Sequence, residues 1–178
     1  PQLVENGTSW TDAGATTTEG SISTSESVNV NLDGNYDVVY TATDGTNTTN
    51  ATRVVTVEDT TLPVITITSG TDTVEKGSTW TDAGATVDTG ETVTVSSTVD
   101  TSTVGVYTVT YSVTDSGGNA ATPKYRTVTV EDTVFPVITI LGDNPQLVEN
   151  GTSWTDAGAT TTEGSISTSE SVNVNLDG

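Results

Sequence analysis

Carboxylate side chains are the only abundant groups in this sequence that could do chemistry. The chain has 24 acidic residues against four basic ones, and it contains no histidine and no cysteine. Carboxylate and amide oxygens are the ligands that calcium prefers, and one ion takes about six to eight of them. The candidate calcium ligands are six residues near expected turns in the middle of the chain, namely Glu58, Asp59, Asp88, Glu91, Asp115 and Asn119. The alternative interpretation is that these residues lie in solvated loops and support turns.

The same composition excludes most other functions. The formal net charge is −20, and four basic residues cannot make the basic face that binding to nucleic acid or to an anionic membrane requires. Zinc fingers, haem sites, thiol nucleophiles and Ser-His-Asp triads need histidine or cysteine, which the chain lacks. No apolar run approaches the roughly 20 residues that span a bilayer. We therefore expect a protein that is not an enzyme and that has calcium as its only cofactor.

The chain repeats itself on two length scales. Residues 1–34 recur without a change as residues 145–178. A shorter, imperfect repeat lies inside this one, because residues 7–16 match residues 77–86 and again residues 151–160. The short repeat is 70–74 residues long, so two diverged copies make up one long repeat. Self-similarity at a fixed period indicates a tandem array of structural units.

These repeats divide the chain into three modules. The first module comprises residues 1–58, the second residues 59–131 and the third residues 132–178. We expect the second module to be complete. The first module lacks the segment that would form its first strand, and the third lacks the segments that would form its last strands.

The second module has the pattern of a small β-domain. Short segments rich in Thr, Val, Ile and Tyr are separated by Gly, Asp, Asn or Ser at intervals of about 8–12 residues. Residues 107–113 alternate between apolar and hydroxyl side chains, which is typical of a half-buried strand. The expected strands are residues 63–67, 74–76, 83–87, 91–99, 106–114 and 125–130. The sequence therefore predicts an all-β protein built of antiparallel β-sandwich domains arranged end to end.

Several motifs resemble immunoglobulin-like domains. Residues 105–109, Gly-Val-Tyr-Thr-Val, stand where such domains have a tyrosine corner, with Val109 in the place of the second cysteine, and residues 34–38 repeat the pattern. Together with the Gly-x-x-Trp-x-Asp-x-Gly-Ala motif of residues 77–85, they resemble a bacterial immunoglobulin-like repeat that is named after a pesticidal crystal protein and is similar to hyalin repeats. The resemblance implies tandem immunoglobulin-like sandwiches in a large secreted surface protein or adhesin.

This topology would gather the candidate calcium ligands. In such a sandwich the incoming linker and two of the loops meet at one end of the domain. The linker contributes Glu58 and Asp59, and the loops contribute the other four residues. Calcium at this end would stiffen the junction between modules and reduce the repulsion between their negative charges. The first module weakens this prediction, because it has Thr18 where the second module has Asp88.

One tryptophan recurs at the same position of each module, as Trp10, Trp80 and Trp154. A surface tryptophan could stack on a sugar. A tryptophan that recurs once per module beside an Asp-Ala-Gly turn is more often part of a core or a junction, and we favour that interpretation.

We expect a structural module of an extracellular filament, stalk or giant adhesin, on the cell surface or secreted, that acts as a rigid spacer or a fibre subunit. Two alternatives stay open. The modules could bind a surface glycan or a protein receptor directly, or they could be accessory domains of a secreted glycan-degrading enzyme. The expected partners are neighbouring modules of the same chain, or identical subunits in a fibre. The perfect 34-residue copy favours a window on one long tandem chain over end modules completed by neighbouring subunits.

Overall fold

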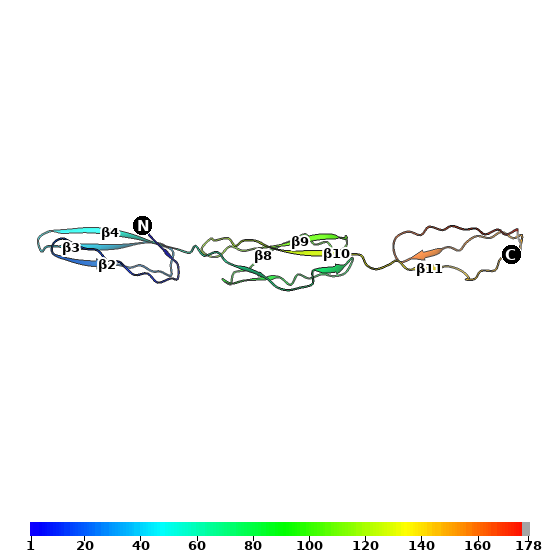
Figure 1. The fold of residues 1–178 in the computed structure, drawn as a ribbon, viewed down its shortest axis with the longest axis horizontal. Helices are drawn as coiled ribbons and strands as arrows, with labels where there is room; N and C mark the ends of the chain where they lie inside the picture. Colours follow the sequence, from blue (N-terminus) through cyan, green and yellow to red (C-terminus); the bar gives the residue numbers. More distant parts are fainter. Residues whose placement is uncertain (176–178) are drawn as a thin grey trace. The chain divides into compact units, whose positions relative to one another are not determined.

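A computed structural model describes residues 1–175, and within them it contains only β-strands and irregular segments. The chain divides into two compact units, Pro1–Glu131 and Asp132–Gly178. The first module forms one four-stranded sheet in the order β1-β4-β3-β2, of which β2, β3 and β4 lie side by side in Figure 1. Its strands are β1 (Gln2–Glu5), β2 (Ser21–Ser25), β3 (Gly34–Thr43) and β4 (Thr48–Glu58).

The second module contains all six of the strands that its sequence predicts. They form a four-stranded sheet in the order β6-β10-β9-β8 and a two-stranded sheet of β5 and β7. The strands are β5 (Ile65–Ile67), β6 (Thr73–Glu75), β7 (Ala85–Val87), β8 (Thr94–Ser97), β9 (Gly105–Ser112) and β10 (Lys124–Glu131). Side chains from both sheets share one core, so the predicted all-β, immunoglobulin-like sandwich is confirmed.

Two strand pairs differ from the prediction of antiparallel strands throughout. β1 pairs in parallel with β4, and β6 pairs in parallel with β10. A parallel pair needs a long crossover connection, and the chain between β6 and β10 supplies one. The parallel register places Glu5 opposite Glu58 in the first module and Glu75 opposite Glu131 in the second. The last strand of each module therefore ends beside a glutamate, Glu5 of β1 in the first module and Glu75 of β6 in the second.

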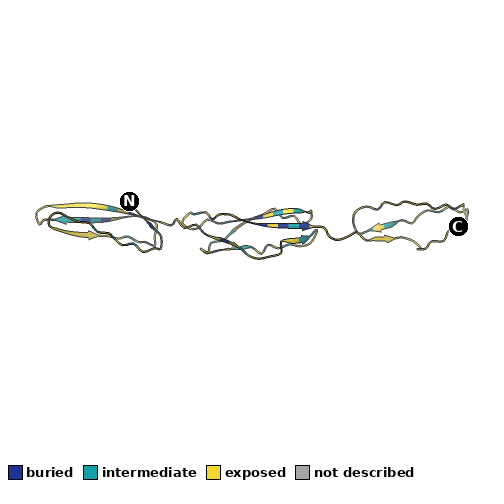
Figure 2. Ribbon diagram, in the orientation of Figure 1, coloured by how far each residue is buried: buried dark blue, intermediate teal, exposed yellow. Residues whose placement is uncertain are grey.

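The core of the second module is small and fully enclosed. Ile65 of β5 is 3% exposed, and it packs in one cluster with Val109, Tyr111 and Val128 from the opposite sheet, none of which is exposed. Buried and more exposed residues alternate along β9 and β10, and Figure 2 colours the buried ones dark blue. This period of two follows from the pleat, which sends successive side chains to opposite faces.

Both predicted tyrosine corners are present. The hydroxyl of Tyr107 donates a hydrogen bond of 2.7 Å to the carbonyl of Thr103, and the hydroxyl of Tyr36 donates one of 2.7 Å to the carbonyl of Leu32. Val109, which takes the place of the cysteine of other immunoglobulin domains, is completely buried. Apolar packing therefore fills the position of a disulfide in this chain.

The third module contains two described strands, β11 (Ile138–Ile140) and β12 (Ala159–Thr161), which pair with each other. It also tests how far local sequence determines strand formation, because it contains the copy of residues 1–34. Residues 2–5 form β1, whereas the identical residues 146–149 form no strand. β1 pairs with β4, and the described part of the third module offers no equivalent of β4. The presence of a partner strand therefore decides whether this segment becomes a strand.

Candidate functional site

The candidate site is the short linker that joins β4 to β5. Glu5 lies beside the start of this linker because the parallel register of β1 and β4 sets it opposite Glu58. Its Oε1 accepts the backbone N–H of Thr60 at 3.0 Å and that of Thr61 at 3.1 Å. The hydroxyls of both threonines also donate hydrogen bonds to the same carboxylate. One carboxylate of the first module thus binds two consecutive linker residues.

These hydrogen bonds stabilise the ionised form of Glu5. They lower its pKa from 4.5 to about 2, and the hydroxyl of Thr60 makes the largest contribution. A carboxylate that accepts several hydrogen bonds at once has a low pKa because protonation would break them. The carboxylate of Glu5 is therefore charged, and able to accept all of these bonds, over the whole neutral and mildly acidic range.

The second module binds the linker from its other side. The side-chain amide of Asn119, in the loop between β9 and β10, donates a hydrogen bond of 2.9 Å to the carbonyl of Asp59. Oδ1 of Asp115 accepts the backbone N–H of Asn119 at 2.7 Å and so holds this loop in shape. A Cβ atom added at Gly117 would lie 2.7 Å from Oδ2 of Asp59, so only glycine fits where the loop passes the linker. Glu5 and Asn119 together bind the linker from both modules.

The structure brings together three of the six predicted calcium ligands. Asp59, Asp115 and Asn119 are joined by the contacts just described. No hydrogen bond within residues 1–175 links the other three to this group. The carbonyl of Glu58 accepts the N–H of Asn6 at 2.9 Å. Oε2 of Glu91 is buried and has no hydrogen-bond partner.

Asp88 has a local structural role. Its Oδ1 accepts the N–H of Val64 at 2.8 Å, beside the first residue of β5. In the third module, the hydroxyl of Thr162 accepts the N–H of Val137 at 3.0 Å in the same way. Because threonine serves as well as aspartate at this position, the contact requires an oxygen acceptor and not a negative charge.

The described residues contain no group of three or more acidic side chains that could hold a metal ion. One feature is nevertheless suited to a cation, since Oδ2 of Asp115 is buried without a hydrogen-bond partner. Buried carboxylate oxygens without a partner are rare and costly. Calcium at this end of the module stays a prediction, with Asp115 and the neighbouring Asp59 as the carboxylates that would bind it.

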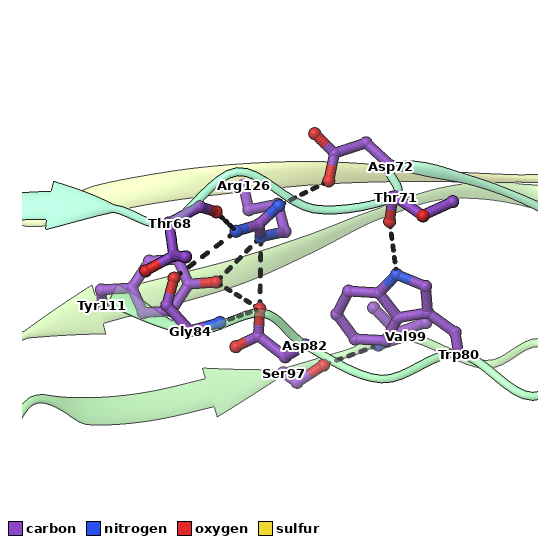
Figure 3. A network of polar contacts seen from close by, with 10 residues as sticks. All are labelled: Thr68, Thr71, Asp72, Trp80, Asp82, Gly84, Ser97, Val99, Tyr111 and Arg126. Carbon is purple, nitrogen blue, oxygen red and sulfur yellow. Dashed lines mark hydrogen bonds and ion pairs between the residues drawn. The ribbon is translucent and has the colours of Figure 1, made fainter. Parts of the chain in front are cut away.

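Sequence reasoning missed a polar network inside the second module, which Figure 3 shows. Arg126 is 4% exposed, and its Nε lies 3.0 Å from the hydroxyl of Tyr111 and 3.2 Å from Oδ1 of Asp82. Its Nη1 donates a bond of 2.7 Å to Asp72, and Nη2 binds the carbonyl of Thr68. The network ties both sheets together through one guanidinium. The signal for it in the sequence is that its members recur at the same repeat positions, as Arg53 and Arg126, Asp12 and Asp82, and Tyr40 and Tyr111.

The network is reduced in the first module. Arg53 pairs with Asp12 at 2.5 Å and lies 5.5 Å from the ring centroid of Tyr40. It has no second carboxylate because Gln2 stands at the repeat position of Asp72. The hydrogen bond from Tyr40 lowers the pKa of Asp12, and burial raises the pKa of Tyr40. Arg126 therefore has more hydrogen-bond and ion-pair partners than Arg53, the equivalent residue of the first module.

Two of the three tryptophans, Trp10 and Trp80, lie against the cores of their modules, as we expected. Trp80 packs on the core cluster of the second module and Trp10 on that of the first. The indole N–H of Trp80 donates a bond of 2.7 Å to the carbonyl of Thr71, whereas those of Trp10 and Trp154 are buried without a partner. The rings of Trp10 and Trp80 therefore pack the segments after β1 and β6 against the cores of their modules.

Comparison with known proteins gives one family. The family described as "Bacterial surface protein, Ig-like domain" matches residues 1–57 and again residues 64–130, which together make up more than half of the chain. No curated protein matches the sequence. Within the described residues there is also no helix of the length and apolarity that crossing a membrane requires.

Proposed function

Because the chain belongs to the bacterial surface protein Ig-like domain family, we propose that its modules are non-catalytic spacers that hold a more distal part of a surface protein away from the cell. The observation that carries this proposal is the linker between the first two modules. Glu5 binds Thr60 and Thr61 from one side, and Asn119 binds the carbonyl of Asp59 from the other. A linker whose backbone is hydrogen-bonded to both neighbours resists bending, as a spacer requires. The more specific resemblance to the pesticidal-crystal-protein type of repeat stays a prediction.

The composition of the linker supports the same role. Pro63 is buried and fixes its own φ angle, which removes a bending freedom next to β5. Only residues 59–64 separate β4 from β5, and a connection this short cannot act as a flexible tether. A spacer of this kind needs no ligand-binding pocket, because its function is the distance that it spans.

A height measurement tests the spacer function. The 144-residue period allows one, two or four long repeats to be joined without a break between a surface anchor and a fluorescent reporter. Stiff modules predict that the height of the reporter grows in proportion to the number of repeats. Flexible junctions predict growth with its square root, in ratios of about 1 to 1.4 to 2. Square-root growth would contradict the proposal.

The adhesive alternative calls for a separate assay. If the modules bound a glycan or a protein receptor directly, the immobilised chain would capture it saturably from an array of surface glycans or matrix proteins. The spacer proposal predicts no saturable capture by the 178-residue chain. The third interpretation, an accessory domain of a glycan-degrading enzyme, predicts binding to the polysaccharide that the enzyme degrades.

Calcium is a separable second part of the proposal. It is supported by the buried and unpartnered Oδ2 of Asp115, which lies in the loop that binds the linker. A cation there would neutralise charge where two negatively charged modules meet. The spacer function does not require it, because the hydrogen bonds of Glu5 and Asn119 hold the linker with protein atoms alone.

A further inference from the structure

One strand pair joins the beginning of the second module to its end. β6 lies near the start of the module and pairs in parallel with β10, its last strand, with Val74 opposite Val130. The first module has the same kind of pair in β1 and β4. In a parallel pair, the N-terminal end of one strand lies far from the C-terminal end of the other. Tension along the chain, which acts on β6 from its N-terminal end and on β10 from its C-terminal end, therefore pulls the two strands lengthwise past each other.

The direction of the pull decides how many hydrogen bonds break at once. Lengthwise sliding loads all the bonds of a strand pair together, whereas peeling from one end breaks them one after another. The β6–β10 pair has a backbone bond on each side of its paired residues. The carbonyl of Asp72 accepts the N–H of Thr129 at 2.8 Å, and the carbonyl of Glu131 accepts that of Lys76 at 2.6 Å. Sliding must break these bonds together with those between the strands.

β5 is the first strand of the module that tension reaches. It pairs with β7 over three residue pairs, and Ile65 fixes it to the core. When β5 detaches, the tension passes along residues 68–72 to β6. The β6–β10 pair is thus the next part of the module to bear the load, and the sheet that contains β8, β9 and β10 is still intact at that stage.

Arg126 of β10 adds a side-chain contact that the same sliding would break. Its Nη1 donates a bond of 2.7 Å to Oδ1 of Asp72, and its Nη2 binds the carbonyl of Thr68, as Figure 3 shows. Both partners lie between β5 and β6, on the part of the chain that tension draws away from β10. The side chain of Asp72 is 53% exposed, and an ion pair this exposed contributes little to the free energy of unfolding at equilibrium. Its place on the loaded part of the chain nevertheless gives it an effect on the unfolding force.

We propose that the β6–β10 pair and the contact between Arg126 and Asp72 form a mechanical clamp, which keeps the second module folded when tension acts along the chain. The module then bears load between the cell and whatever the surface protein holds, which is more than keeping the two apart. Forced unfolding is governed by the unfolding barrier and not by the equilibrium stability. The proposal is separate from the spacer function, because modules with weak clamps and stiff linkers would still pass the height measurement.

Pulling the full chain in two directions tests the clamp. The chain has no cysteine, so two introduced cysteines can carry the handles of an optical trap. Leu62→Cys/Phe135→Cys places them at exposed positions before and after the module, where they load β6 against β10 lengthwise. In the matched control Val104→Cys/Phe135→Cys, the handles lie just before β9 and beyond the end of β10. The antiparallel register places these two ends together, so this pull peels β10 from β9.

The clamp predicts an unfolding force several times higher for Leu62→Cys/Phe135→Cys than for the control, although the folded module is the same. Adding Asp72→Ala should lower the force in the lengthwise direction and leave the peeling force unchanged, with little change in stability toward urea. Asp100→Ala, which removes another exposed carboxylate whose bonds stay within its own loop, should leave the lengthwise force unchanged. Equal forces in the two directions, or a lengthwise force unchanged by Asp72→Ala, would overturn the proposal.

Discussion

Glu5 and Thr60 lie 55 residues apart in the sequence, and the carboxylate of Glu5 accepts the backbone N–H of Thr60 at 3.0 Å. The contact joins a residue of the first strand of one module to the linker that leads into the next. It depends on the parallel pairing of β1 with β4, which brings the start of the module to its end. The parallel strand pair, which differs from the antiparallel prediction, is therefore what positions the junction contact.

The first prediction concerns the titration of Glu5. Its pKa is lowered from 4.5 to about 2, so the hydrogen bonds to the linker are fully present above about pH 4.5 and are lost as the pH falls toward 2. The carboxyl carbon shift of Glu5 in NMR should follow that midpoint. In the control Thr60→Val/Thr61→Val, which removes both hydroxyl donors, the midpoint should move back toward 4.5. A Glu5 midpoint near 4.5 in the unmodified chain would show that the contact does not form in solution.

The second prediction concerns Arg126. Replacing it by methionine should destabilise the second module by about 2–3 kcal/mol, because it leaves the hydroxyl of Tyr111 and the carbonyl of Thr68 without their buried hydrogen-bond donor. Asp72→Ala should cost no more than about 1 kcal/mol, since the side chain of Asp72 is 53% exposed. Urea denaturation followed by Trp80 fluorescence, with Trp10 and Trp154 replaced by phenylalanine, measures this module alone.

Arg53→Met provides the comparison for that experiment. Its side chain is 28% exposed, and its partners are the carboxylate of Asp12 and the carbonyl of Gly14. Because it is more exposed and pairs with one carboxylate in place of two, its loss should destabilise the first module by less than the loss of Arg126 destabilises the second. Equal effects at both positions would mean that the additional partners of Arg126 contribute nothing measurable.

The third prediction concerns the tyrosine corner. Tyr107→Phe removes one hydrogen bond and keeps the ring, so it should lower the free energy of unfolding of the second module by about 1 kcal/mol. Tyr125→Phe is the matched control, because Tyr125 is 62% exposed and should change the stability little. The same urea titration distinguishes them, and two equal effects would contradict a special role for the corner.

The fourth prediction concerns calcium. If Asp115 and Asp59 bind it, calcium at about 100 times its dissociation constant should stabilise the folded chain by about 2.7 kcal/mol and raise its melting temperature. Asp115→Asn should abolish the rise. A melting temperature that is the same in a chelator and in millimolar calcium would show that calcium does not bind to the folded chain. The hydrogen bonds at the junction do not depend on that result.

The sequence predicts the strands and tyrosine corners well because both follow from local signals. Alternating side chains mark β9, and the Gly-x-Tyr pattern marks the corner at Tyr107. The partners of Arg126 could not be predicted in this way. Asp82 and Tyr111 lie 29 residues apart, and only the packing of the two sheets brings them to one guanidinium. The local contacts of the predicted calcium ligands could not be predicted either: Asp88 accepts the N–H of Val64, whereas Asp115 accepts that of Asn119.

The two copies of the 34-residue segment show most clearly what the sequence of one segment cannot predict. Residues 15–17 are not paired, whereas the identical residues 159–161 form β12. β11 precedes β12 in the chain, and no such strand precedes residues 15–17 within the described chain. A strand needs a partner as well as a suitable sequence, so predictions from one segment alone cannot distinguish these cases.

The stiffness of the junction tests the central claim most directly. Spin labels at Thr52→Cys and Thr127→Cys, one in each of the first two modules, report the distance between them by pulsed electron resonance. We predict a narrow distance distribution that broadens in Glu5→Ala, toward that of a free six-residue linker, whose root-mean-square end-to-end distance is about 13 Å. Glu149→Ala, which changes the copy of the same residue, should leave it narrow. A distribution that is broad in the unmodified chain, or unchanged by Glu5→Ala, would contradict the account.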